Sequence, residues 1–172
     1  ENIASMLKMT EKAVIALGLE GEVFSTDMLI TSDGKVYVLE VACRMAGSRF
    51  VSEIVPLATG LNILPNAIRL CLGRDISHEE LQPKFSRNVI SRFLPSQEGT
   101  VVSIGELDSL KKNDGVYDVF WEQNLKPGDK TPAYKSGKDI IAGVIVISDS
   151  LQLAEIIDNR VFNNLPLDIM GR

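Results

Sequence analysis

The sequence predicts an α+β protein in two parts: helices and an antiparallel hairpin up to residue 82, then a small β-rich part over 83–172 with a closing helix. Two observations predict this class. In the first part, apolar residues recur at helical spacing and then alternate with period two, whereas short alternating runs dominate after Pro83. Turn residues separate these runs, and no internal repeat or low-complexity tract occurs.

The first elements are a helix and a hairpin. Residues 3–18 place apolar side chains at helical spacing, and Gly18 stands where the helix should end. Residues 22–31 and 35–42 alternate with period two and are rich in β-branched side chains, so we expect two strands. Asp33-Gly34 is the preferred pair for a two-residue type I′ turn between them.

Two further helices are expected before residue 82. One begins at about Arg49 with Ser48 as its N-cap, and Gly60 ends it. The next has Asn62 as its cap and Gly73 as its stop. In the β-rich part, we expect strands at 88–94, 100–105, 116–121 and 142–148, followed by a helix over 151–161.

Composition excludes several classes of function. The net charge of -5 argues against a nucleic-acid partner, because phosphate backbones require concentrated Lys and Arg. No apolar run reaches the ~18 residues of a membrane span, so no membrane partner is expected. Cys43 and Cys71 lie among apolar residues and are expected to be buried free thiols in a reducing, cytoplasmic compartment.

The hairpin carries an acid in the middle of each strand. With a two-residue turn, Ser32 pairs with Lys35 and Asp27 faces Glu40, with Cβ atoms ~4.5–5.5 Å apart. Ser25 then faces Ala42, and Leu29 faces Val38, on the same side. Either one acid is protonated, both are solvated at an edge, or a cation lies between them. Mg²⁺ or Mn²⁺ suits two carboxylates without His or Cys.

An anion site is expected directly after the second strand. Arg44 follows Glu40 by four residues, and Gly47-Ser48 opens the expected helix. Free N–H groups at a helix start and a guanidinium both bind phosphate or carboxylate. Arg49 and Glu53 are one turn apart, so they form either a surface ion pair or a contact to an amino-acid substrate.

Residues 27–63, "DMLITSDGKVYVLEVACRMAGSRFVSEIVPLATGLNI", resemble the C-terminal catalytic core of the ATP-grasp superfamily. The similarity is strongest to L-amino-acid ligase-like enzymes, a carboxylate–amine ligase branch, and weaker to biotin carboxylase and D-alanine–D-alanine ligase. It implies that 1–82 is the C-terminal portion of an ATP-grasp domain, an antiparallel sheet with helices, and that 83–172 is a β-rich C-terminal subdomain. The resemblance is specific over 18–73.

The resemblance also implies roles for the residues that match its pattern. Asp27 would bind one Mg²⁺ and Glu40 would bridge two ions. Arg44 would be catalytic by holding the phosphate, and Gly47 would offer its backbone N–H to the substrate or phosphate; the expected helix start adds Ser48 to this phosphate site. Ala42 stands where many members have an Asn ligand, which puts the second ion in doubt.

The function implied is that of an ATP-dependent carboxylate–amine ligase that forms an acyl phosphate. Its partners would be ATP, Mg²⁺ (or Mn²⁺), a small carboxylate and an amine; homodimer formation is left open. The chain begins at Glu1, and no GxGxxG or GxxxxGK[ST] loop is present. We therefore expect a C-terminal fragment, inactive alone, whose N-terminal half carries the ATP-binding lysines. The alternatives are a non-catalytic interaction or dimerisation module and a biotin-carboxylase-like carboxylase.

Overall fold

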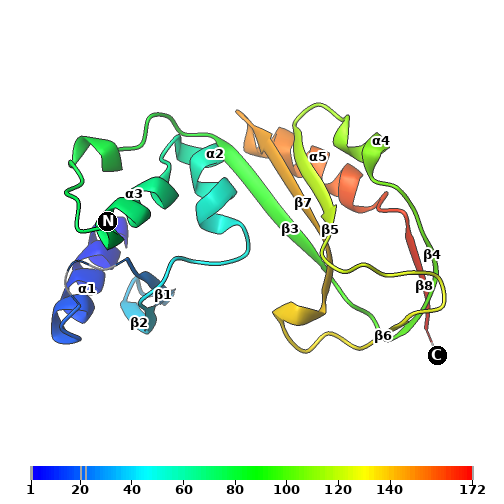
Figure 1. Ribbon diagram of the computed structural model, residues 1–172, viewed down its shortest axis with the longest axis horizontal. Coiled ribbons are helices and arrows are strands. Elements are labelled where there is room, and N and C mark those ends of the chain that lie inside the picture. The colour runs from blue at the N-terminus through cyan, green and yellow to red at the C-terminus, as the bar shows by residue number, and fades with distance from the viewer. Residues whose placement is uncertain (1, 20, 22, 172) are drawn as a thin grey trace. The chain divides into compact units, whose positions relative to one another are not determined.

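A computed structural model describes residues 2–19, 21 and 23–171 (Figure 1). The chain divides into two compact units, Glu1–Lys84 and Phe85–Arg172. Each unit combines helices with antiparallel strands, so the predicted α+β class is confirmed. Among the described residues, no helix has both the length and the apolar character needed to cross a membrane.

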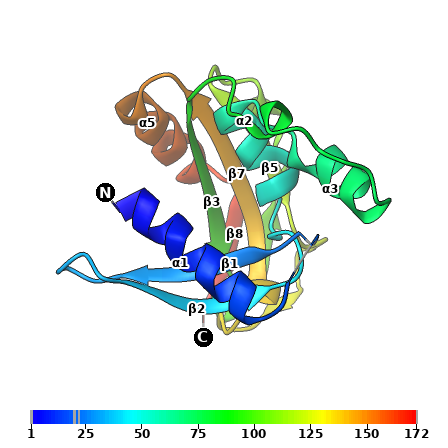
Figure 2. The same ribbon diagram turned by 90° about the vertical axis from the view of Figure 1, so that its left-hand side faces the viewer.

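The first unit begins with α1 (Asn2–Ala16), which lies across the hairpin and contacts its second strand (Figure 2). Gly18 adopts a left-handed φ of 68° and donates its N–H to the Ile15 carbonyl, while Leu19 donates to Val14. These two bonds form a Schellman motif, which ends the helix at the glycine as predicted. Residue 22, the expected start of the next strand, lies outside the described residues.

The hairpin pairs β1 (Ser25–Ile30) with β2 (Val36–Ala42), and Asp27 faces Glu40 as predicted. The predicted two-residue turn is wrong, because Ile30 pairs with Val36. A longer loop results, with Gly34 at a left-handed φ of 79°. The Thr31 hydroxyl accepts the Lys35 N–H at 3.1 Å, so it satisfies the donor that opens the second strand.

A β-bulge in β2 shifts the strand pairing by one residue between the turn and the two acids. Met28 pairs with Val38 whereas Asp27 pairs with Glu40, so Leu39 is an extra residue in β2. The predicted pairing of Leu29 with Val38 is therefore wrong, and Leu29 faces Tyr37. The longer loop shifts the register by one residue and the bulge shifts it back, which is why the acids still meet.

The segment after the hairpin differs from the predicted capped helix. It begins as a π-helical turn, η1 (Phe50–Ile54), and continues as α2 (Val55–Thr59), which ends at Gly60 as expected. Ser48 is not the N-cap: Arg49 precedes the first helical residue, and no side chain caps it. Both residues have left-handed backbones, with φ of 53° and 62°, so the chain enters the helix through a sharp turn.

The rest of the first unit is helical and irregular. Asn62 precedes α3 (Ile63–Cys71), which ends before the left-handed Gly73. A 3₁₀ turn, η2, follows at Glu79–Leu81. The expectation of buried thiols is wrong, because Cys43 and Cys71 are both exposed. Cys43 follows the end of β2 and Cys71 lies in the last turn of α3, so neither belongs to a buried face.

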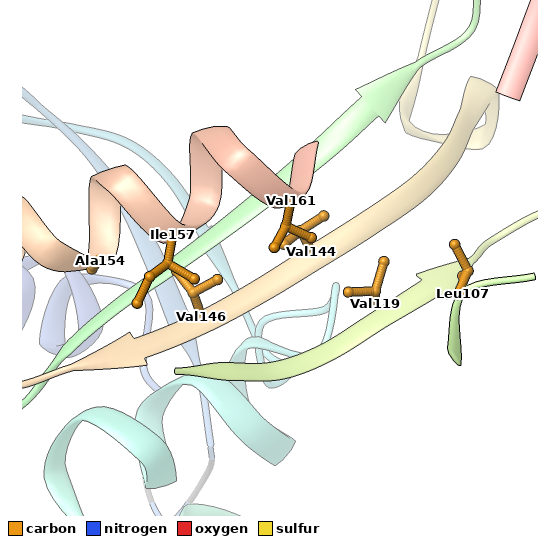
Figure 3. Close-up of a cluster of buried hydrophobic side chains, with 7 residues drawn as sticks. All are labelled: Leu107, Val119, Val144, Val146, Ala154, Ile157 and Val161. Carbon is orange, nitrogen blue, oxygen red and sulfur yellow. The ribbon is translucent and has the colours of Figure 1, made fainter. Parts of the chain in front are cut away.

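The second unit is built on a three-stranded antiparallel sheet in the order β3-β7-β5. The strands are Asn88–Pro95, Ile140–Ser148 and Val116–Trp121. The closing helix α5 (Leu151–Phe162) packs on β3 and β7, and the Ser150 hydroxyl caps it by accepting the Leu153 N–H. Buried side chains of β5, β7 and α5, together with Leu107, form the core (Figure 3): Leu107, Val119, Val144, Val146, Ala154, Ile157 and Val161.

A second small sheet, in the order β6-β4-β8, completes this unit. Its strands are Lys130–Thr131, Gly99–Ile104 and Leu167–Met170. The sequence predicts β4 but not β6, β8, the short helix α4 (Asp108–Lys111) or the 3₁₀ turn η3 (Gly137–Asp139). The four elements that the sequence does not predict are two to four residues long, which is too short for a clear hydrophobic period.

Candidate functional site

A cavity of about 210 Å³ in the first unit contains most of the predicted site residues. Its lining residues are Ser25, Asp27, Glu40, Arg44, Ala46 and Gly47. Four of the five predicted site residues therefore come together, and Ser48 is the exception. Ser25 was expected on the same face of the hairpin as Asp27, so the register already pointed to it. No sequence signal marked Ala46.

The two carboxylates come from opposite strands at one level of the ladder. Asp27 and Glu40 are paired at their Cα atoms, and both residues are exposed. Directly paired positions place Cβ atoms ~4.5–5.5 Å apart, close enough for both carboxylates to reach one cation. The bulge begins at the next pair, and bulges commonly redirect side chains next to functional sites. Because both side chains are exposed, water can reach the carboxylates and a cation can lie between them.

Arg44 lies just beyond the end of β2. Its N–H donates to the Ala42 carbonyl at 2.7 Å, which turns the chain sharply at Cys43. The guanidinium donates through Nη1 to the Met45 carbonyl at 3.2 Å. Among the interactions of the described residues, Nε and Nη2 have no partner, so the guanidinium keeps donors for an anion.

The loop after Arg44 exposes backbone donors. Gly47 accepts a hydrogen bond from the Phe50 N–H at 3.0 Å, but within the described part of the chain no acceptor faces the N–H groups of Gly47 and Ser48. Gly47 has an ordinary φ, and a Cβ on it would meet no atom within 4 Å. Neither backbone strain nor packing within the described residues therefore explains the glycine.

Arg49 and Glu53 form the ion pair that the sequence offered as one of two alternatives. Nε and Nη2 of Arg49 each donate to one Glu53 carboxylate oxygen at 2.6 Å. The two side chains are 27% and 20% exposed, so this bidentate pair is partly shielded from water. It anchors the start of the π-helical turn immediately after Ser48.

The chemistry of the cavity fits a hard divalent cation. Within the described residues, no group of three or more His, Cys, Asp or Glu side chains could hold a metal, which disfavours a structural zinc site. Two carboxylates suit Mg²⁺, which keeps several waters and commonly binds through one or two carboxylates plus phosphate oxygens. Asp27 and Glu40 would hold such an ion, and Arg44 would lie at the same cavity.

Larger cavities occur elsewhere among the described residues, and those of about 490 and 390 Å³ do not join paired acids to an arginine. One, about 490 Å³, lies in the second unit and is lined by Glu98, Lys130 and Lys135 among others. Another, about 390 Å³, lies between the start of α3 and the loop before Lys84. We assign the site to the cavity of about 210 Å³ because its two acids and its arginine lie around one space. The volume of a cavity alone does not identify a functional site.

Solved structures provide the decisive comparison. An L-amino acid ligase from Bacillus licheniformis matches 99% of this chain at 26% identity and a TM-score of 0.76. A phosphoribosylglycinamide synthetase from Anaerococcus prevotii matches 99% at 17% identity and a TM-score of 0.72. The chain has the C-terminal part of the ATP-grasp fold. No family model matches the sequence, and neither does any curated protein.

The ATP-grasp fold also occurs in carboxylases with weaker similarity to this chain. The biotin carboxylase domain of a 2-oxoglutarate carboxylase from Hydrogenobacter thermophilus, in complex with MgADP and bicarbonate, matches 93% at 19% identity and a TM-score of 0.58. This chain covers 34% of that domain's chain, 41% of the ligase and 42% of the synthetase. It therefore spans less than half the length of the ATP-grasp proteins that it matches.

Proposed function

We propose that this chain supplies the metal- and phosphate-binding side of the active site in an ATP-dependent carboxylate–amine ligase. The observation that carries the proposal is the convergence of Asp27, Glu40, Arg44 and Gly47 on one cavity within an ATP-grasp fold. The ligase is preferred over the carboxylase because the ligase structure has the higher identity and TM-score of the two.

Asp27 and Glu40 would hold Mg²⁺ together with the phosphates of ATP. Bound there, the ion would neutralise charge on the β- and γ-phosphate oxygens. The two carboxylates repel one another without a cation, since they are directly opposite on the ladder. They therefore gain more from a divalent ion than two separate surface acids would.

Arg44 and the loop at Gly47 would bind the phosphate that is transferred. The free Nε and Nη2 donors of Arg44 match two phosphate oxygens, and the Gly47 N–H adds a neutral donor. Ser48 remains a weaker candidate, through its backbone N–H, because its side chain does not line the cavity. A glycine at 47 leaves room for a ligand to approach the backbone closely.

The reaction would then run in two steps. A substrate carboxylate oxygen attacks the γ-phosphorus of ATP, the bond to the bridging oxygen breaks, and ADP leaves with the formation of an acyl phosphate. An amine nitrogen attacks the acyl carbon, loses a proton, and inorganic phosphate leaves. In both steps Arg44 would offset negative charge on the phosphoryl group, which is electrostatic catalysis without a covalent enzyme intermediate.

Trapping of the acyl phosphate tests this function. The full-length protein is incubated with ATP, Mg²⁺, hydroxylamine and a panel of amino acids and small carboxylates, and hydroxamate is measured with ferric iron. The proposal expects carboxylate-dependent hydroxamate in step with ADP release. ADP release that depends on bicarbonate, without hydroxamate from the panel, would instead favour the carboxylase. A protein that uses no ATP under any condition would indicate a non-catalytic module.

A further inference from the structure

The cavity contains one oxygen-bearing side chain, on Ser25, that the metal-binding residues implied by sequence do not include. We propose that the Ser25 hydroxyl is a third protein oxygen ligand for the divalent cation held by Asp27 and Glu40. The inference rests on the proposed function, because it assumes that the two carboxylates bind a cation. It adds a ligand residue that neither the acid pair nor the arginine predicts.

The ladder places Ser25 on the same face as the acids. Ser25 pairs with Ala42 two residues from the Asp27–Glu40 pair, and side chains two residues apart on a strand share a face. The bulge begins only after Asp27, so it does not interrupt this stretch of β1. Diagonal neighbours on one face lie ~7–8 Å apart at the backbone, a span that one ion can bridge with bonds of ~2.1 Å and flexible carboxylates.

The Ser25 hydroxyl is available for a ligand. It is half-buried, lines the cavity, and makes no hydrogen bond with any residue that the structure describes. The neighbouring Thr26 hydroxyl is buried and has no hydrogen-bond partner among the described residues, but strand alternation directs it to the opposite face. Ala42, opposite Ser25, carries no oxygen, so Ser25 is the sole source of a side-chain oxygen at that level of the hairpin.

A serine hydroxyl is suitable chemistry for this position. Mg²⁺ and Mn²⁺ prefer oxygen donors, and a serine or threonine hydroxyl binds Mg²⁺ in phosphate-binding loops. A neutral ligand adds a bond without adding a third negative charge to a site where two carboxylates already repel one another. The structure thus offers a two-carboxylate, one-hydroxyl ligand set, with water and phosphate completing the shell.

The first test measures Mn²⁺ affinity of the full-length protein from the electron paramagnetic resonance signal of free Mn²⁺, without nucleotide. Ser25→Ala should weaken binding about tenfold, the loss expected for one contact to a charged group. Thr26→Val removes the neighbouring hydroxyl from the other face and should leave the affinity unchanged. Ala42→Ser in the Ser25→Ala background restores an oxygen across the ladder and should recover most of the affinity.

A second measurement separates direct ligation from a remote hydrogen bond. Ser25→Cys replaces a hard oxygen with a soft sulfur, so Mn²⁺ binding should weaken while Zn²⁺ binding strengthens. Cys43→Ser and Cys71→Ser are made in both the wild-type and the Ser25→Cys protein, because those two thiols are exposed and could bind Zn²⁺ themselves. Weaker Mn²⁺ binding without a gain in Zn²⁺ binding would contradict direct ligation.

The outcomes distinguish this inference from the function on which it depends. Asp27→Asn with Glu40→Gln should abolish Mn²⁺ binding. If it does and Ser25→Ala retains wild-type affinity, the Ser25 assignment is wrong while the carboxylate site stands. If the carboxylate variant binds Mn²⁺ normally, or the wild-type protein binds none, the metal site itself is wrong. Circular dichroism of each variant checks that a loss of binding is not a loss of folding, and Ser25→Thr, which keeps the hydroxyl, should bind normally.

Discussion

At the residue scale, the main feature is a pair of like charges that the hairpin places directly opposite one another. Asp27 and Glu40 are neighbours across a ladder, an arrangement that costs stability unless a cation or solvent compensates. Both side chains are exposed, so the repulsion is partly screened by water. In the proposed site, the arginine and the backbone donors beside the acids would bind an anion next to a cation, which is the combination that a metal–phosphate complex requires.

Arg44→Lys tests the arginine. Lysine keeps the charge but lacks the planar fork, so a bidentate phosphate contact should be lost. We expect kcat of the full-length enzyme to fall about a hundredfold, or on the order of 3 kcal/mol, with a smaller change in nucleotide affinity. Arg74→Lys, at an exposed arginine beyond α3, is the matched control. Near-normal kcat for Arg44→Lys would make this arginine structural.

At the element scale, the hairpin shows how far sequence patterns reach. Its two strands could be predicted, because two alternating runs with a turn glycine between them are typical of a hairpin. The loop length and the bulge at Leu39 could not be predicted from these patterns. The two features shift the register by one residue in opposite directions, so the predicted pairing of Asp27 with Glu40 is still correct. The left-handed backbone at Ser48 and Arg49 also had no signal, since neither residue type favours that conformation.

The second unit shows the same division between strong and weak patterns. The predicted strands that correspond to β3, β4, β5 and β7 and the predicted helix that corresponds to α5 are confirmed to within two residues at each end, because each carries a clear period or a cap. The short strands β6 and β8 are recognisable only from their pairing with β4, a contact between segments far apart in the sequence. The candidate site required the fold as well, since sequence alone left three outcomes open for the acids.

Gly34→Ala tests the observed loop. Gly34 has a left-handed φ of 79°, so a side chain there should cost about 1 kcal/mol of unfolding free energy. Urea unfolding followed by circular dichroism and hydrogen exchange of the Thr31 amide, which bonds to Lys35, measures the effect. Gly47→Ala is the control and should change stability by less than ~0.5 kcal/mol, because its φ is ordinary. Equal stabilities for the two variants would contradict the loop conformation.

Asp139, in the turn η3, should make the stability of the second unit depend on pH. The backbone N–H groups of Lys135 and then Ser136 hold the pKa of this carboxyl below its ordinary value of 3.8. A depressed pKa stabilises the fold above the ordinary value, and that contribution is lost as pH falls through the lowered value. Asp139→Asn should therefore destabilise the second unit at neutral pH and converge with wild type at acidic pH.

Fluorescence of Trp121 in β5 reports urea unfolding of this unit at each pH. Asp149→Asn is the control: its side chain is 93% exposed, and its ion pair with Arg87 is long at 3.6 Å. A constant difference between Asp139→Asn and wild type across the pH range would show that the carboxylate's charge is not responsible.

At the scale of the whole molecule, the activity expected of this chain alone depends on how much of an ATP-grasp protein it spans. It spans 41% of the ligase and 42% of the synthetase that it resembles. We predict that residues 1–172 alone form no ATP-dependent product and bind ATP only weakly, because the chain spans less than half the length of these two proteins. Carboxylate- and amine-dependent ADP release by the purified chain would contradict this division of the site.

The most direct test of the metal–phosphate site is ATP turnover by the full-length protein with Asp27→Asn and Glu40→Gln combined. Both substitutions keep the side-chain shape while removing the charges, and Glu106→Gln with Glu155→Gln removes two charges from exposed acids of the second unit as a control. We predict that turnover falls at least ~100-fold in the first variant, while its metal-free form unfolds at the same or a higher urea concentration because the repulsion is relieved. The control should retain full turnover. Unchanged turnover in the Asp27→Asn, Glu40→Gln variant would show that these carboxylates do not hold the catalytic metal.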